Sequence, residues 1–258
     1  YKKNNLSETI ASKKLLELRK KNKYFFSLSF ETISAYGKNA ALPHYISSEM
    51  KNNFLKKNNI YLFDSGGQYF DGTTDITRTI VIGIAKKEQK EHFTRVLKGH
   101  ISLIMTKFKN KTRGSEIDYI ARKSLKEIGC DYEHGTGHGI GSFLNVHEGP
   151  QRISKSIKKD DSLLKPGMIL SIEPGYYKIN SYGLRIENLV MIKKEKKDFL
   201  SFEIISFAPI DKNLILPNLL THKERKWLNQ YHQNVFNKLY NYLNNNEKTW
   251  LKKIIQPL

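Results

Sequence analysis

The chain has 258 residues, of which 39% are hydrophobic and 27% are charged, a balance typical of a soluble globular protein with a buried core. No apolar run approaches the length of a membrane span, and the single cysteine excludes an intrachain disulfide and fits a reducing, cytoplasmic setting. The net charge of +19 comes mainly from lysines spread along the whole chain, so we interpret it as a solvated surface and expect neither a nucleic acid nor a membrane as partner.

The first half of the chain is predicted to alternate between helices and strands. We expect a helix over 7–23, capped by Ser7, and two short strands between 24 and 45. The apolar runs at 60–64 and 75–84 predict two further strands, the first followed by a turn at Gly66-Gly67. Helices are expected at about 87–107 and 115–128.

The second half begins with a glycine-rich loop over 134–149. Strands are expected over 168–173, over 183–193 and near 200–208, and a helical tail over about 221–256. Because most of these strands are joined by turns rather than by helical crossovers, the pattern predicts an α+β fold.

Two aspartates lie at the edges of neighbouring predicted strands. Asp64 ends one strand and Asp75 opens the next, so a hairpin would place the two carboxylates side by side. Adjacent carboxylates repel each other unless a proton or a cation lies between them, and a divalent metal ion is the natural occupant. Bonding to its own turn backbone suffices to explain Asp71, which precedes Gly72, but is a weaker explanation of Asp75 before an apolar strand.

Three histidines fall within fourteen residues of the glycine-rich segment: His134, His138 and His147. The alternating glycines argue against a helix. The segment also lacks the third glycine of a dinucleotide-binding loop and the Lys-Ser/Thr ending of a P-loop. A single histidine is more often structural than functional, but three so close together favour a functional site.

Two glutamates, Glu173 and Glu187, lie in apolar strand settings. A buried glutamate needs a partner. For Glu187 this is a metal ion, Arg185 or both, since Arg185 lies two residues away on the same face of the strand. Together with the aspartates and one histidine they form an oxygen-rich set that suits Mn²⁺, Co²⁺, Fe²⁺ or Zn²⁺. Four carboxylates are too many for one catalytic ion with an open position, and suit two ions roughly 3.5–4 Å apart.

Five segments closely resemble the pita-bread metallopeptidases, the family that includes aminopeptidase P, prolidase, methionine aminopeptidase and creatinase. The segments are LFDSGGQY at 62–69, DGTTDITRT at 71–79, HGTGHGIGSFLNVHEGP at 134–150, EPGYY at 173–177 and GLRIEN at 183–188. The aminopeptidase P branch is the best match, and the resemblance extends over nearly the whole chain.

The resemblance implies the pita-bread fold, a curved antiparallel sheet flanked by helices, with a helical C-terminal extension. We expect a catalytic domain over 1–208 and the extension, packed on it, over 209–258. Aminopeptidase P carries further domains before its catalytic domain, and we expect these to be absent from this chain.

The resemblance also implies a cytoplasmic hydrolase that removes the first residue from peptides with proline at the second position. Such an enzyme uses two divalent ions, foremost Mn²⁺, with a bridging hydroxide as nucleophile, and forms a homodimer in the full-length protein. Asp64 would bind one ion, His138 and Glu173 the other, and Asp75 and Glu187 both.

The remaining site residues are carried over from the same motifs. Glu173 would also move the proton from the nucleophile to the leaving nitrogen. His147 would steady the tetrahedral intermediate, and His44 and His134 would line the substrate cleft with it. Arg185 would orient the neighbouring groups.

Three alternatives remain open. Methionine aminopeptidase and prolidase share the fold and differ in their substrates. A non-catalytic pita-bread module that binds RNA or protein is less favoured, because such modules lose metal ligands and this chain keeps all five.

Overall fold

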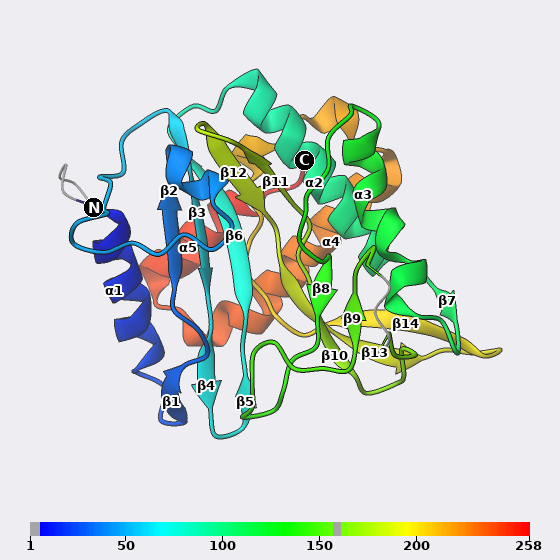
Figure 1. Ribbon diagram of the computed structural model, residues 1–258. Coiled ribbons are helices and arrows are strands. Elements are labelled where there is room, and N and C mark those ends of the chain that lie inside the picture. Colours follow the sequence, from blue (N-terminus) through cyan, green and yellow to red (C-terminus); the bar gives the residue numbers. More distant parts are fainter. Residues whose placement is uncertain (1–5, 157–160) are drawn as a thin grey trace.

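The computed structural model describes residues 6–156 and 161–258 of the chain (Figure 1). Its α-helices are α1 (Glu8–Arg19), α2 (Lys87–Ile104), α3 (Asp118–Lys126), α4 (His222–Leu239) and α5 (Asn245–Ile254). The strands of the first half are β1 (Phe25–Leu28), β2 (Ile33–Tyr36), β3 (Asn59–Ser65), β4 (Gly67–Tyr69), β5 (Gly72–Thr73), β6 (Ile76–Ile82) and β7 (Phe108–Lys109). Those of the second half are β8 (Gly137–His138), β9 (Arg152–Ile153), β10 (Ile169–Ile172), β11 (Gly175–Lys178), β12 (Tyr182–Arg185), β13 (Asn188–Lys194) and β14 (Phe199–Ile204).

Two antiparallel sheets form the centre of the molecule. One has the order β2-β3-β6 and the other the order β10-β13-β14-β7. In the first sheet Asp64 lies opposite Thr77, so the ends of β3 and β6 that carry the two candidate aspartates are neighbours. In the second, Ile172 lies opposite Asn188, which brings the residue before Glu173 next to the residue after Glu187. The pairing therefore brings the four carboxylates together two by two, and a hydrogen bond from the amide of Glu187 to the carbonyl oxygen of Thr77 joins the two sheets at this point.

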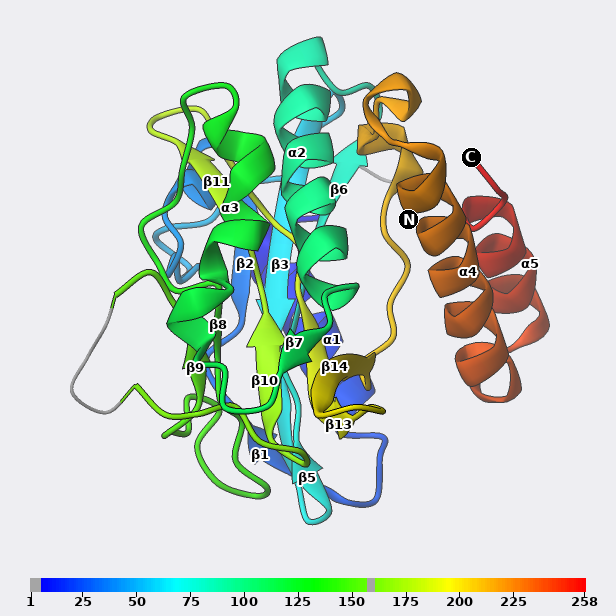
Figure 2. The same cartoon turned by 90° about the vertical axis from the view of Figure 1, so that its right-hand side faces the viewer.

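Helices α2 and α3 cover one face of these sheets, and Figure 2 shows them between the sheets and the viewer. Their close crossing requires Gly99, because a Cβ atom there would lie 2.0 Å from the carbonyl oxygen of Ala121. Phe93, Val96 and Leu97 of α2 are buried in the largest hydrophobic cluster. Burial of this face supplies most of the energy that holds the helices on the sheet.

The helices α4 and α5 lie side by side at one edge of the molecule (Figure 2). Each begins with a capping box, formed by Thr221 with Glu224 and by Asn244 with Glu247. Leu228, Val235 and Leu251 are buried in the same cluster as α2. The C-terminal helices are thus part of the main hydrophobic core.

Several predicted elements are confirmed and others need correction. Ser7 caps α1 as expected, with its hydroxyl accepting from the amide of Ile10 at 3.3 Å. The helix ends at Arg19 rather than at residue 23, because the amides of Lys21 and Asn22 bond to carbonyl oxygens three residues back and form turns. The predicted tail is wrong as one helix, since the chain turns between α4 and α5 and the second capping box starts a new helix.

The prediction of one strand over 183–193 is also wrong. The strand is interrupted at Ile186 and Glu187, where β12 ends and β13 begins with a different partner strand. The Gly66-Gly67 turn leads into a small hairpin, β4–β5, that was not predicted. Among the described residues, no helix combines the length and apolar character needed to cross a membrane.

Candidate metal centre

A cleft of about 470 Å³ opens beside the ends of β3 and β10. Its lining includes eight of the nine candidate site residues: His44, Asp64, Asp75, His134, His138, His147, Glu173 and Arg185. The ninth, Glu187, is almost fully buried, with an exposed fraction of 1%. A ligand oxygen of Glu187 nevertheless lies within 4.8 Å of ligand atoms of Asp75 and His138. The structure therefore places all nine candidates in or directly beneath one cleft.

His138 is held so that one ring nitrogen faces the carboxylates. Its backbone amide donates to the hydroxyl of Ser171 at 3.0 Å, and Nδ1 donates to the carbonyl oxygen of Gly139 at 3.0 Å. Because a carbonyl can only accept, the neutral ring carries its lone pair on Nε2. That atom lies 3.3 Å from Oε1 of Glu173 and 3.5 Å from Oδ2 of Asp75. Three lone-pair-bearing atoms so close together need a proton or a cation between them.

The position of His138 depends on a glycine beside it. A Cβ atom on Gly137 would lie 1.9 Å from the carbonyl oxygen of Ser171. The close approach of the two backbones is what brings β8 against β10. The alternating glycines of this segment thus allow the imidazole to reach Glu173.

The carboxylates of the cluster are crowded and only partly satisfied. Within residues 6–156 and 161–258, three buried carboxylate oxygens have no hydrogen-bond partner: Oδ1 of Asp64, Oδ1 of Asp75 and Oε1 of Glu187. Burial, followed by repulsion from the neighbouring carboxylates, holds the pKa of Asp75 and of Glu187 well above the usual range. Burial also raises the pKa of Glu173, although His138 and Arg185 oppose the shift. These three carboxylate oxygens lack hydrogen-bond partners, and their raised pKa values show that negative charge is unfavourable there. Both features fit a site that binds divalent cations.

Arg185 is a buried cation of this region and pairs with Asp64 rather than with Glu187. Its Nη2 lies 2.8 Å from Oδ2 of Asp64, and its side chain is 3% exposed. The oxygen Oε2 of Glu187 instead accepts from the hydroxyl of Thr77 at 2.8 Å. Of the two partners considered for Glu187, Arg185 is not in contact with its carboxylate, because β12 ends at Arg185 and Glu187 lies in the gap before β13.

The three other candidate histidines differ in their hydrogen bonding and in their exposure to solvent. Nδ1 of His134 donates to the carbonyl oxygen of Gly135 at 2.7 Å, and its Nε2 lies 2.9 Å from the hydroxyl of Tyr177. Burial, together with the nearby Arg185, lowers the pKa of His134 to about 4, so the ring is neutral. His147 and His44 are exposed in the cleft, and the ring of His147 lies 4.1 Å from that of His138. Burial and then the neighbouring imidazole of His138 lower the pKa of His147.

Three polar residues that support the cluster were not predicted. Thr77 donates to Glu187, the hydroxyl of Ser171 lies 3.3 Å from Oε1 of Glu173, and Tyr177 accepts from Nη1 of Arg185 at 2.7 Å. Thr77 and Tyr177 lie inside two of the motif segments, and Ser171 lies two residues before Glu173. Alternation along the strands could have identified Thr77 as facing the same side as Asp75.

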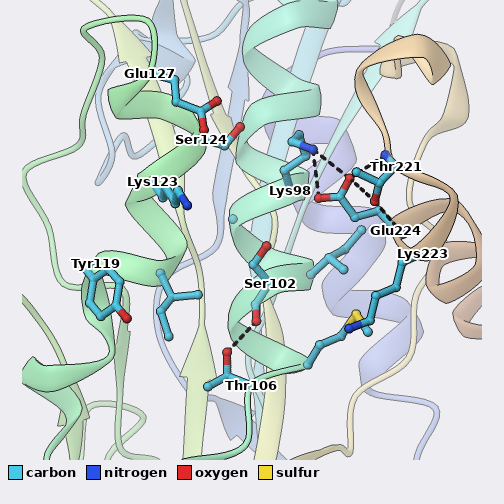
Figure 3. Close-up of a pocket in the computed structure, with 14 residues that line it drawn as sticks. Lys98, Ser102, Thr106, Tyr119, Lys123, Ser124, Glu127, Thr221, Lys223 and Glu224 are labelled. Atoms are coloured by element: carbon cyan, nitrogen blue, oxygen red, sulfur yellow. Dashed lines mark hydrogen bonds and ion pairs between the residues drawn. The ribbon is translucent and has the colours of Figure 1, made fainter.

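A second cavity, of about 530 Å³, lies between α2, α3 and the start of α4 (Figure 3). The partly buried cation in its lining, Lys98, is already paired and lies 2.7 Å from Oε2 of Glu224. The hydroxyl of Thr106 donates to the carbonyl oxygen of Ser102 at 2.8 Å. In this slightly larger hollow the buried group without a hydrogen-bond partner is a neutral hydroxyl, that of Ser124, whereas the smaller cleft holds unpartnered carboxylate oxygens. Chemistry rather than volume therefore identifies the site.

Sequence comparisons show which family this chain resembles. The profile of metallopeptidase family M24 matches residues 2–194, and that of the C-terminal region of peptidase M24 matches residues 198–258. A relative from Sclerotinia sclerotiorum, named Probable Xaa-Pro aminopeptidase P, is 44% identical over 98% of this chain and 44% of its own length. One from Coprinopsis cinerea with the same name is 45% identical over 98% of this chain and 42% of its own length. The chain thus spans less than half the length of these relatives.

Solved structures point to the same family. The X-prolyl aminopeptidase of Caenorhabditis elegans, described as a cytosolic enzyme with a di-nuclear active site, superposes with a TM-score of 0.94 and is 39% identical. That match covers 98% of this chain and 42% of the other. Prolidase from Pyrococcus furiosus gives a TM-score of 0.66 at 33% identity, over 76% of this chain and 54% of that one. The pita-bread fold expected from the motifs is confirmed, and the chain belongs to metallopeptidase family M24.

Proposed function

We propose that this chain is the catalytic part of a dinuclear metal-dependent aminopeptidase that hydrolyses the N-terminal Xaa-Pro bond of peptides. The observation that carries the proposal is the open cleft whose floor holds three buried, unpartnered carboxylate oxygens beside the bare Nε2 of His138. The names of the relatives, and the di-nuclear active site of the Caenorhabditis elegans enzyme, supply the reaction.

In this proposal Asp64 would hold one ion, His138 and Glu173 would hold the other, and Asp75 and Glu187 would contribute to both. The donor set is rich in carboxylate oxygen with one imidazole, which suits a hard or borderline ion, and we propose Mn²⁺ before Zn²⁺, Co²⁺ or Fe²⁺. Two bound divalent ions supply Lewis-acid activation of water and of the scissile carbonyl.

The protein groups around the ions have separable roles. Glu173 faces the cleft, with 17% of its side chain exposed, and we assign to it the transfer of a proton to the leaving nitrogen. His147 is exposed beside His138 and can donate a hydrogen bond to the oxygen of the reacting carbonyl. Arg185 holds Asp64 and Tyr177, and Tyr177 in turn holds the neutral ring of His134.

The cleft also offers apolar surface for a substrate. Its lining includes Phe30, Ile33 and Val146, whose apolar side chains we call the apolar wall, and His44. A proline ring is compact and apolar, and it removes the amide hydrogen that an open peptide would need to satisfy. We propose that the apolar wall receives the proline at the second position.

Metal analysis and peptide cleavage test the proposal together. We expect about two ions per chain and hydrolysis of an Xaa-Pro-Xaa tripeptide that requires added Mn²⁺. An Xaa-Pro dipeptide and a Met-Ala-Xaa tripeptide serve as comparison substrates, because they are typical of prolidase and of methionine aminopeptidase. Exclusive cleavage of either one would refute the assignment.

The role of Glu173 has its own test. Glu173→Gln keeps the size of the side chain but cannot carry the proton, so we expect kcat to fall by roughly 10²–10⁴-fold. Glu203→Gln, at an exposed position on β14, is the matched control and leaves kcat unchanged. An active Glu173→Gln enzyme would show that another group moves the proton.

We also propose that the full-length protein is a cytoplasmic homodimer. The cytoplasmic setting is supported by the similarity to the Caenorhabditis elegans protein, which is described as a cytosolic enzyme. Light scattering on the full-length protein tests the assembly, and a monomer at micromolar concentration would contradict it.

A further inference from the structure

The guanidinium group of Arg78 lies directly behind the candidate metal centre. The residue is on β6, one position after Thr77, and is 2% exposed. Its Nη1 donates to the carbonyl oxygen of Thr77 at 2.8 Å and to that of Glu187 through a short hydrogen bond. One side chain therefore fixes the main chain of two residues whose side chains are also bonded to each other.

Arg78 contacts the main chain of Glu187, a candidate metal ligand, and of Thr77, whose side chain supports that ligand. The hydroxyl of Thr77 donates to Oε2 of Glu187 at 2.8 Å, and the amide of Glu187 donates to the carbonyl oxygen of Thr77 at 3.2 Å. Glu187 lies in the gap between β12 and β13, outside the regular strand pairing. Its orientation therefore depends on these few hydrogen bonds rather than on a continuous ladder.

The far side of Arg78 is held by a residue of the C-terminal region. The hydroxyl of Tyr231, on α4, accepts from Nη2 of Arg78 at 2.7 Å and from Nδ2 of Asn188 at 3.0 Å. It donates to the carbonyl oxygen of Ala208 at 2.8 Å. Asn188 directly follows Glu187 and also accepts from Nη2 of Arg78 at 3.2 Å. The hydroxyl of Tyr231 thus uses its full hydrogen-bonding capacity inside the protein.

The ring of Tyr231 is itself fixed by packing. It stacks on Trp227 with the ring centroids 5.3 Å apart and an interplanar angle of 4°. Tyr231 is 2% exposed. A buried, fully bonded and stacked side chain has little freedom, so it can hold Arg78 in one position.

We infer that Tyr231 is a positioning residue for Glu187, acting from the C-terminal region through Arg78 and Asn188. The inference deepens the proposed function, because it rests on Glu187 as a metal ligand. Partners behind a ligand set the direction of its lone pairs, and their loss typically lowers metal affinity by tenfold or more. A purely structural role would instead attach α4 to the body of the protein and leave metal affinity unchanged.

The variant Tyr231→Phe separates these two roles, because it removes one hydroxyl and keeps the stacked ring. Its matched control is Tyr182→Phe, since Tyr182 is also 2% exposed and its hydroxyl lies 2.7 Å from Nδ1 of His92, away from the cleft. The affinity of the metal-free proteins for Mn²⁺ is measured by calorimetric titration, and their stability by thermal melting.

We expect both variants to melt at lower temperature, and only Tyr231→Phe to bind Mn²⁺ about tenfold more weakly. With an Xaa-Pro tripeptide, Tyr231→Phe should lower kcat and leave KM unchanged. Wild-type affinity in Tyr231→Phe, or an equal loss of affinity in Tyr182→Phe, would overturn the inference.

A second variant covers the case in which Tyr231→Phe does not fold. Trp227→Leu removes the stacked ring and keeps the hydroxyl of Tyr231, and we expect a smaller but measurable loss of affinity. Unchanged affinity there would count against the inference. Because metal affinity needs no substrate, a wild-type protein that binds Mn²⁺ without cleaving Xaa-Pro peptides would refute the proposed function and leave this test intact.

Discussion

Arg185 and Asp64 form a buried ion pair at the floor of the cleft, with Nη2 2.8 Å from Oδ2. The same guanidinium donates to the hydroxyls of Tyr177 at 2.7 Å and Thr77 at 3.1 Å. The guanidinium of Arg185 therefore orients three side chains. They are the candidate ligand Asp64, Thr77, which supports the candidate ligand Glu187, and Tyr177, which contacts His134. Only a fork of several donors can do this, which makes lysine a poor substitute.

Arg185→Lys should lower kcat by roughly 10–100-fold, because it keeps the charge but loses most of the directed hydrogen bonds. Metal content at saturating Mn²⁺ should stay near that of the wild type. Steady-state kinetics and metal analysis on the same preparation check both statements. Wild-type kcat in the lysine variant would mean that charge alone is sufficient.

Asp75→Asn should stabilise the metal-free protein while weakening its metal binding. The folded pKa of Asp75 is raised, so folding is penalised once pH exceeds the unfolded pKa of about 4, and the penalty grows up to the folded pKa. Near pH 4 the metal-free Asp75→Asn variant should therefore be no more stable than the wild type. At pH 8 its melting temperature should be higher by more than roughly 2 °C.

Melting curves in chelator, with and without added Mn²⁺, measure this effect. Asp71→Asn is the control, because Asp71 is exposed in the turn between β4 and β5, and it should change nothing. A metal-free Asp75→Asn protein that melts below the wild type at pH 8 would contradict the charge-crowding explanation.

Gly137→Ala should lower Mn²⁺ affinity and activity together. The new Cβ would meet the carbonyl oxygen of Ser171 at 1.9 Å, so β8 must move away from β10 and carry His138 with it. We expect a loss of at least tenfold in affinity, comparable to removing a supporting hydrogen bond. Gly72→Ala, where no atom lies within 4 Å of the added Cβ, should bind Mn²⁺ like the wild type. Equal behaviour of the two variants would disprove the close-approach argument.

His232 should make the protein less stable in mild acid. The residue is fully buried, and Nε2 accepts from the amide of Ile210 at 3.1 Å. Burial, aided by Lys212 and Arg78, lowers the pKa of His232 to about 4. A lowered folded pKa means that the unfolded chain takes up the proton first, so stability is complete above pH 6.5 and falls as pH drops toward 4.

Between pH 7.5 and pH 5 this one group should cost about 2 kcal/mol of unfolding free energy. His232→Phe should be less stable at pH 7.5, because Ile210 loses its acceptor, but should lose less on acidification. Denaturant titrations at the two pH values measure both quantities. An equal fall in wild type and variant would rule out His232 as the source.

Local sequence patterns predicted the parts of this protein that are fixed by neighbouring residues. The Ser7 cap, the strand ends at Asp64 and Asp75, and the turn position of Asp71 follow from side-chain chemistry within a few residues. The gap at Glu187 could not be predicted, because an apolar run of Leu, Val, Met and Ile reads as one strand, whatever its partners. Partner strands are chosen over long distances, and periodicity carries no information about them.

The same limit applies to the candidate site. Motif resemblance named the residues that surround the cleft. A pairing of Arg185 with Glu187 was considered from spacing along one strand, but the observed partner, Asp64, comes from another strand. The role inferred for Tyr231 could not be seen in the sequence at all, since it lies 153 residues from Arg78.

The candidate ligands come from β3, the start of β6, β8, the end of β10 and the gap after β12, so neighbouring ligands in space are separated by up to about half the chain. Closing such long loops costs conformational entropy, and this cost arises before the stabilising long-range contacts have formed. A partly folded chain with β10 and β13 unpaired cannot assemble the set. Uptake of Mn²⁺ should therefore occur late in refolding, after the secondary structure has formed, and stopped-flow measurements would see it as the slowest step.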